Sequence, residues 1–163
     1  MIEQIFTVGG YGFTETSFVY TLSRARVDFF CDVRQRRGMR GSKYAFLNSN
    51  RLQGLLSGAG IQYLHFKDFS PTDSIRQSQK DEDSKFGVLK RSRERLGFAF
   101  VKGYQAEVLA LKSQHDFLDR IPTSISRPCI FCVEREPLAC HRSLLADWLS
   151  AYKGIPLIHL GPE

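Results

Sequence analysis

The sequence predicts an α/β fold in a single domain, with a mainly parallel five-stranded sheet flanked by helices. Short apolar runs alternate along the chain with segments whose apolar residues recur at helical spacing, as in strand–helix–strand units. One run, VDFFCDV at residues 27–33, is mostly apolar, which is typical of strands buried on both faces of a parallel sheet. The 163 residues suit one domain built around one core.

The elements follow one another in a regular order. We expect strands at residues 2–8, 27–33, 61–66, 129–134 and 155–160. We expect helices at residues 14–25, 50–57, 89–96, 104–118 and 143–152, the first of them capped by Thr14 or Thr16. A long polar loop follows the second strand. The segment 70–85, rich in Asp, Ser and Gln, is expected to be an exposed excursion.

The composition restricts the class of protein. The chain has 23 lysines and arginines against 17 acids, a formal net charge of +6. This surplus favours anionic partners such as nucleic acid, nucleotides or phosphorylated metabolites, or it serves solubility alone. We see no secretory leader pattern, no apolar stretch that would span a bilayer, and no disulfide framework in the four cysteines. We therefore expect a cytoplasmic protein with reduced thiols, without membrane contact and without a cofactor.

Residues that follow the strands are the first candidates for a site, because ligands of open α/β sheets bind beyond the carboxyl ends of the strands. Gly10 and Tyr11 follow the first strand, and they either contact a ligand or form a plain tight turn. Asp32 ends the second strand, and Arg34 lies two residues later on the same face. This acid and this guanidinium form a structural ion pair, or both face a ligand.

The loop after the second strand is strongly basic. It has five cations between Arg34 and Lys43 and no acid. Arginine binds phosphate through two parallel hydrogen bonds and aromatic rings stack on bases, so Arg37 and Tyr44 are candidate ligand contacts. A solvated basic loop is the alternative. A second basic run, LKRSRERL at residues 89–96, either widens the same positive surface or forms a solvated helix face.

The segment CVEREPLACHR, residues 132–142, has the densest group of ionisable side chains. Glu134, at the expected strand end, is the candidate general acid/base or carboxylate nucleophile. Cys140, His141 and Arg142 fall at a helix N-terminus, where free amides and the helix dipole favour anions. Arg142 is therefore a candidate anion contact and His141 a candidate ligand contact. Cys140 is either a nucleophile or a small buried residue at a turn.

The motifs TVGGYG, FFCDVR, GIQYLHF and CVEREPLACHRSLLADWL occur in this order over nearly the whole chain, and together they resemble the DUF488 family, a domain of unknown function. The resemblance implies that the family's motif positions are Asp32, Arg34, Cys132, Glu134, Cys140, His141 and Arg142. Many members continue Asp-Val-Arg with proline and serine, where this chain has QRRGMRGSKYAF. Ser42 is the candidate counterpart of that serine. The family name implies a site but no reaction.

Three functions fit these residues. We favour an enzyme that acts on a nucleotide or nucleic acid. Glu134 would be the acid/base or nucleophile, Asp32 would assist it, and arginines would hold phosphate. Cleavage or transfer at an N-glycosidic bond is the simplest reaction for such a site. A non-catalytic nucleic-acid-binding module is the alternative. Thiol chemistry or a metal held by Cys132, Cys140 and His141 is the third function.

Overall fold

Five parallel strands form the centre of the fold. They are β1 (Ile5–Val8), β2 (Phe29–Asp32), β3 (Gln62–His65), β4 (Pro128–Phe131) and β5 (Leu157–Leu160), and their order across the sheet is β3-β2-β4-β1-β5. The computed structural model describes all residues from 1 to 163. The predicted α/β class and the five-stranded sheet are confirmed, and every strand pair is parallel.

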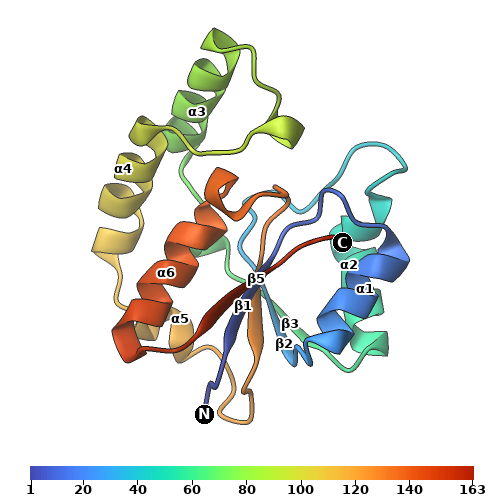
Figure 1. The fold of residues 1–163 in the computed structure, drawn as a ribbon. Coiled ribbons are helices and arrows are strands. Elements are labelled where there is room, and N and C mark those ends of the chain that lie inside the picture. Colours follow the sequence, from blue (N-terminus) through green and yellow to red (C-terminus); the bar gives the residue numbers. More distant parts are fainter.

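Helices cover both faces of the sheet (Figure 1). The helices α1 (Glu15–Arg24) and α2 (Ser49–Gly58) lie on one face, and α5 (His115–Leu118) and α6 (His141–Lys153) lie on the other. The helices α3 (Asp73–Lys85) and α4 (Phe98–Glu107) pack against each other, and α4 also contacts α6. None of these helices has the length and apolar character needed to cross a membrane.

Aromatic side chains fill the layer between the sheet and α1. Phe18 of α1 lies with its ring centroid 6.1 Å from that of Phe30 and 5.8 Å from that of Phe131, and all three side chains are fully buried. Thr14 starts the helix above them, because its side chain and that of Ser17 form a capping box. Strands covered on both sides need few polar residues, which explains the apolar runs in the sequence.

Segment 70–85 contains a helix that the sequence analysis did not predict. Thr72 caps α3 by accepting a hydrogen bond from the amide of Ile75. Ile75 and Gln79 are buried on the side of the helix that meets α4. The thirteen residues of α3 are mostly polar and bury little apolar surface. The contact with α4 therefore stabilises this helix, and a broad apolar face of its own does not. Apart from Ile75 and Gln79, residues 73–85 are exposed or half-buried, as expected for an excursion, but the omission of a helix from this segment was wrong.

The predicted helix at residues 89–96 is also wrong. Only a short 3-10 turn, Lys90–Ser92, forms there, and the backbone is extended on both sides of it. The amide of Leu96 donates to the carbonyl of Leu138, so this segment is held by the loop before α6. The predicted helix at 104–118 is broken into the end of α4, a 3-10 turn (Leu109–Leu111) and the short α5. The strand β4 ends at Phe131, before the predicted end at residue 134.

The connections of the central strands create a crevice beyond their carboxyl ends. The strand β4 lies between β2 and β1 in the sheet. The chain leaving β1 and β2 runs to α1 and α2 on one face, whereas the chain leaving β4 runs to α6 on the opposite face (Figure 1). Loops that diverge in this way from neighbouring strands leave room between them, and ligands of doubly wound folds bind at such a point.

Candidate functional site

A cavity of about 370 Å³ lies at this crevice. Its inner wall comes from the loop after β4 and from the start of α6, where Cys132, Val133, Glu134, Cys140 and His141 line it. Pro137 opens a short 3-10 turn that returns the chain toward the sheet, so that two residues far apart in this loop, Cys132 and Cys140, face the same space. The segment singled out in the sequence is thus one wall of a cavity.

The side chains around the cavity have an unbalanced charge. Eight lysines and arginines line it, together with a single carboxylate, that of Glu134. The cations come from three separate parts of the chain, namely the loop after β2, the helix α3 and the segment before α4: Arg34, Arg36, Arg40, Arg76, Lys80, Lys90, Arg91 and Arg93. Converging cations with few acids create a positive potential that attracts anionic ligands.

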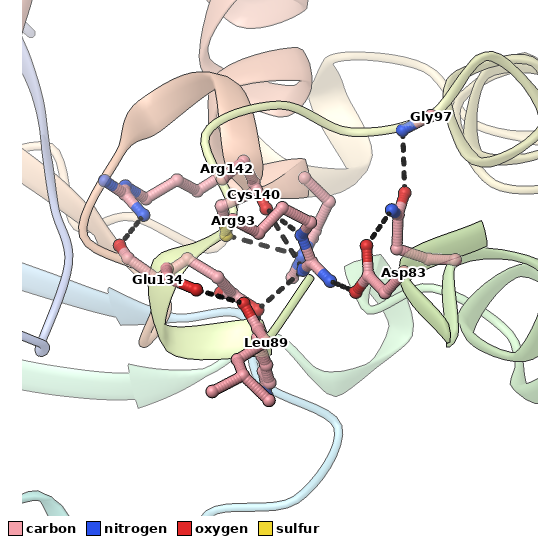
Figure 2. Close-up of polar contacts among 12 residues, drawn as sticks. Asp83, Leu89, Arg93, Gly97, Glu134, Cys140 and Arg142 are labelled. Carbon is pink, nitrogen blue, oxygen red and sulfur yellow. Dashed lines mark hydrogen bonds and ion pairs between the residues drawn. The ribbon is translucent and has the colours of Figure 1, made fainter. Parts of the chain in front are cut away.

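Glu134 is buried beside two of these cations (Figure 2). Its Oε1 lies 3.3 Å from Nη2 of Arg93 and 3.7 Å from Nζ of Lys90. Burial raises the pKa of Glu134, but Lys90, a hydrogen bond from Cys140 and Arg93 outweigh it and lower the pKa to about 2. The carboxylate is therefore ionised at neutral pH. Its second oxygen, Oε2, is buried and has no hydrogen-bond partner.

Arg93 joins Glu134 to the helix α3 and to the loop before α6. Its Nη1 donates to Oδ2 of Asp83 at 2.6 Å, and its Nη2 donates to the carbonyl of Ala139 at 3.2 Å. Asp83 in turn accepts a hydrogen bond from Gln79, whose side-chain oxygen accepts one from the amide of Gly97 (Figure 2). This chain of contacts fixes the segment 90–97 over the cavity and orients the one carboxylate in it.

Two thiols and an imidazole meet next to Glu134. The ligand atoms of Cys132, Cys140 and His141 all lie within 4.8 Å of one another, and Sγ of Cys140 is 3.8 Å from Nδ1 of His141. A hydrogen bond with Cys140, burial and nearby negative charge raise the pKa of Cys132 well above its ordinary value. Burial lowers the pKa of His141, but Cys132, Glu134 and the carbonyl of Val33 outweigh it, so the net shift is upward.

Asp32 and Arg34 form a buried ion pair. Nε of Arg34 donates to Oδ1 of Asp32 at 2.9 Å and Nη2 donates to Oδ2 at 2.8 Å, while Nη1 donates to the carbonyl of Leu47. The hydroxyl of Tyr63 also donates to Oδ2 of Asp32. Arg34 lines the cavity, but Asp32 lies behind it and does not. The pair thus anchors the basic loop that follows β2.

The glycine-rich loop after β1 lies directly against the loop that carries Glu134. A Cβ on Gly9 would overlap with the carbonyl oxygen of Glu134, and a Cβ on Gly10 would overlap with Cδ1 of Leu47. Gly9 therefore allows a close approach of two backbones, and Gly10 leaves room for the side chain of Leu47. Tyr11, the next residue, lines the cavity, and the guanidinium of Arg91 lies 5.3 Å from the centre of its ring.

The residues singled out in the sequence divide into two groups. Five line the cavity: Tyr11, Arg34, Glu134, Cys140 and His141. Six do not: Gly10, Asp32, Arg37, Ser42, Tyr44 and Arg142. Ser42 is exposed at the tip of the basic loop, and Arg37 bonds to the hydroxyl of Tyr63. Tyr44 is buried, and its hydroxyl accepts a hydrogen bond from the amide of Gly12.

Arg142 has partners other than the expected anion. Its guanidinium donates to the carbonyls of Glu134 and Arg135 at 2.5 and 3.1 Å, and its side chain is fully buried (Figure 2). These bonds fix the loop that carries Glu134 and leave Nε of Arg142 without a partner. In this structure Arg142 positions the carboxylate and does not reach the cavity.

Several cations of the cavity were not among the site residues predicted from the sequence. Arg91 and Arg93 belong to the basic run at residues 89–96, for which a wider positive surface or a solvated helix face was expected. Arg76 and Lys80 lie four residues apart on α3, so they share one helical face. That spacing is visible in the sequence, but it becomes meaningful only once the segment is known to be helical.

Comparison with known proteins gives one match. The family model described as "Domain of unknown function DUF488" matches residues 15–149. No match was found among the curated proteins or among the solved structures.

Proposed function

Since the chain belongs to the DUF488 family, a domain of unknown function, we propose its function from the geometry of the cavity. We propose an enzyme that acts on a nucleotide, or on an exposed nucleotide of a nucleic acid, with Glu134 as the reacting carboxylate. The observation that carries this proposal is the single buried carboxylate, with one unpartnered oxygen, in a cavity whose lining includes eight cations and no other acid.

The cations support binding of a phosphorylated ligand. Guanidinium groups form bidentate hydrogen bonds with phosphate, and those of Arg36, Arg40 and Arg91 are exposed beside the cavity without an acidic partner among the ion pairs of the protein. A volume of about 370 Å³ lies in the range of small-molecule sites. It suits one nucleotide better than a duplex.

The position of Glu134 supports chemistry at a sugar carbon. Cleavage of an N-glycosidic bond leaves the bonding electrons with the base and positive charge on the sugar, and a fixed carboxylate stabilises that charge or bonds to the carbon. Water or another acceptor then takes the place of the carboxylate, and the proton that it loses passes to the departed base. Arg93 and Arg142 hold Glu134 and its backbone in one orientation, as such a step requires.

The test is mass spectrometry of products after incubation of the protein with mixed nucleotides, single-stranded DNA and RNA. Glu134→Gln is compared with wild type and with Glu136→Gln, which alters an exposed acid of the same loop. The proposal predicts product with wild type and with Glu136→Gln, and at least about a 100-fold loss with Glu134→Gln. If all three proteins retain oligonucleotides in a salt-sensitive manner and none forms product, the protein is a binding module instead.

A further inference from the structure

The cluster of Cys132, Cys140 and His141 has a geometry that the proposed function does not use. Its three ligand atoms lie within 4.8 Å of one another, although Cys132 belongs to the loop after β4 and the other two belong to the start of α6. Ligands of a tetrahedral zinc ion lie about 2.0–2.3 Å from the metal and hence less than 5 Å from one another. The three atoms are therefore already close enough to share one ion.

The imidazole of His141 is oriented toward the two thiols. Its Nε2 lies 3.0 Å from the carbonyl oxygen of Val33, which can only accept a hydrogen bond, so Nε2 carries a proton. In the neutral ring, Nδ1 then has the free lone pair, and this atom faces Sγ of Cys140 at 3.8 Å. Histidines that bind metals are commonly fixed in this way, by a bond from the other ring nitrogen to a backbone carbonyl.

The thiols of Cys132 and Cys140 interact mainly with each other, with His141 and with Glu134. Cys140 is the N-cap residue of α6, yet its side chain makes no capping hydrogen bond. Both residues line the cavity, and their sulfur atoms lie within 4.8 Å of each other. The other two cysteines, Cys31 and Cys129, are buried within strands and do not belong to the cluster. The chain thus contains two convergent thiols and two that serve as internal controls.

We infer that Cys132, Cys140 and His141 form a binding site for a thiophilic divalent cation, for which Zn²⁺ is the best match. Two thiolates and one imidazole are ligands that zinc prefers, and catalytic zinc sites combine three protein ligands with one open position. Two thiolates balance the charge of the ion, so the bound group is neutral and compatible with burial. All three residues line the cavity, so the open position faces the ligand space beside Glu134.

The first experiment is elemental analysis of protein that has been reduced, incubated with zinc and desalted. We expect one zinc ion per chain in wild type and in the control variants Cys31→Ser and Cys129→Ser. We expect Cys132→Ser and Cys140→Ser to weaken zinc binding by more than about 100-fold, because loss of a direct ligand costs more than loss of an outer hydrogen bond. The inference is overturned if reduced wild type retains no zinc, or if all variants retain it equally.

Cobalt substitution keeps the inference testable if the serine variants fail to fold. Wild type loaded with Co²⁺ should show the thiolate-to-cobalt charge-transfer absorption and the intense visible bands of a tetrahedral site. A six-coordinate cobalt spectrum without thiolate bands would contradict the inference. So would a Cys132–Cys140 disulfide in isolated protein that binds no metal after reduction. Neither measurement involves a substrate, so failure here leaves the proposed nucleotide chemistry untouched.

Discussion

Arg93→Met removes the side chain that connects Glu134 to α3. The resulting loss in the free energy of unfolding follows from the contacts of Arg93. The arginine is about 10% exposed, Asp83 is 13% exposed and Glu134 is 8% exposed. Without the guanidinium, both carboxylates stay nearly buried and lose their closest cation. Breaking a buried ion pair by removing one partner costs about 3–5 kcal/mol. Gln79 still donates to Asp83 and Lys90 still faces Glu134, so we expect the lower value, about 3 kcal/mol.

Urea unfolding at pH 7 measures this cost. We expect the midpoint to fall with an unchanged m value, and the melting temperature to drop by about 6–12 °C for a chain of this size. Arg95→Met is the matched control, because Arg95 is exposed and forms no ion pair. Its effect should stay within about 0.5 kcal/mol.

A double variant separates loss of the ion pairs from loss of packing. Adding Asp83→Asn to Arg93→Met removes one of the two unpaired charges, so it should restore about 1 kcal/mol of the loss. Equal stability of Arg93→Met and Arg95→Met would refute the claim that Arg93 clamps the site. A double variant no more stable than the single one would show that packing and not charge gives the effect.

Three further changes test the surroundings of the site. Gly9→Ala should destabilise the protein by about 2 kcal/mol in urea unfolding, because the added Cβ would overlap with a backbone carbonyl. As the control, Gly54→Ala in the open middle of α2 should stabilise the protein by about 0.5 kcal/mol. If Gly9→Ala leaves the stability unchanged, the close approach of the two backbones is contradicted. Asp32→Asn should lower the free energy of unfolding by about 3 kcal/mol in the same assay, since the buried guanidinium of Arg34 loses its anion. A decrease below about 1 kcal/mol would contradict the burial of this ion pair. The pKa of Asp68 is raised by burial but lowered more by Arg120 and Lys112, with a net decrease. Its carboxylate thus stabilises the fold above the ordinary pKa of about 3.9, and this contribution is lost as the pH falls through the lower folded value. Since Asp68 is 47% exposed, Asp68→Asn should cost only about 0.5 kcal/mol at pH 7 and nothing in acid, and a pH-independent cost would contradict the pairing.

The sheet could be predicted because its strands are buried on both faces. An uninterrupted apolar run such as FFC in β2 has few alternatives to a central strand, and the polar residues that follow such strands indicate the ligand edge. Glu134, Cys140 and His141 were found for this reason. Their neighbours in space come from distant segments, and the sequence does not reveal those contacts.

The helix α3 and the segment at residues 89–96 could not be predicted from local pattern. The helix is almost wholly polar, and its contact with α4 decides its structure. The segment has helical spacing, but the ion pairs of Arg93 and the hydrogen bond to Leu138 hold it in a largely extended form. The role of Arg142 could not be predicted from the local sequence either. Its sequence position suits an anion contact, and only the fold reveals that backbone carbonyls surround its guanidinium.

The central claim is that the cationic cavity holds a phosphate beside Glu134, and calorimetric titration tests it most directly. Wild type is titrated in parallel with a nucleoside 5′-monophosphate and with the same nucleoside lacking the phosphate. Two charge-assisted contacts to phosphate predict at least about 100-fold tighter binding of the monophosphate, with an advantage that shrinks as salt is added. Equal affinity for the two compounds, or no binding of either, would contradict the account.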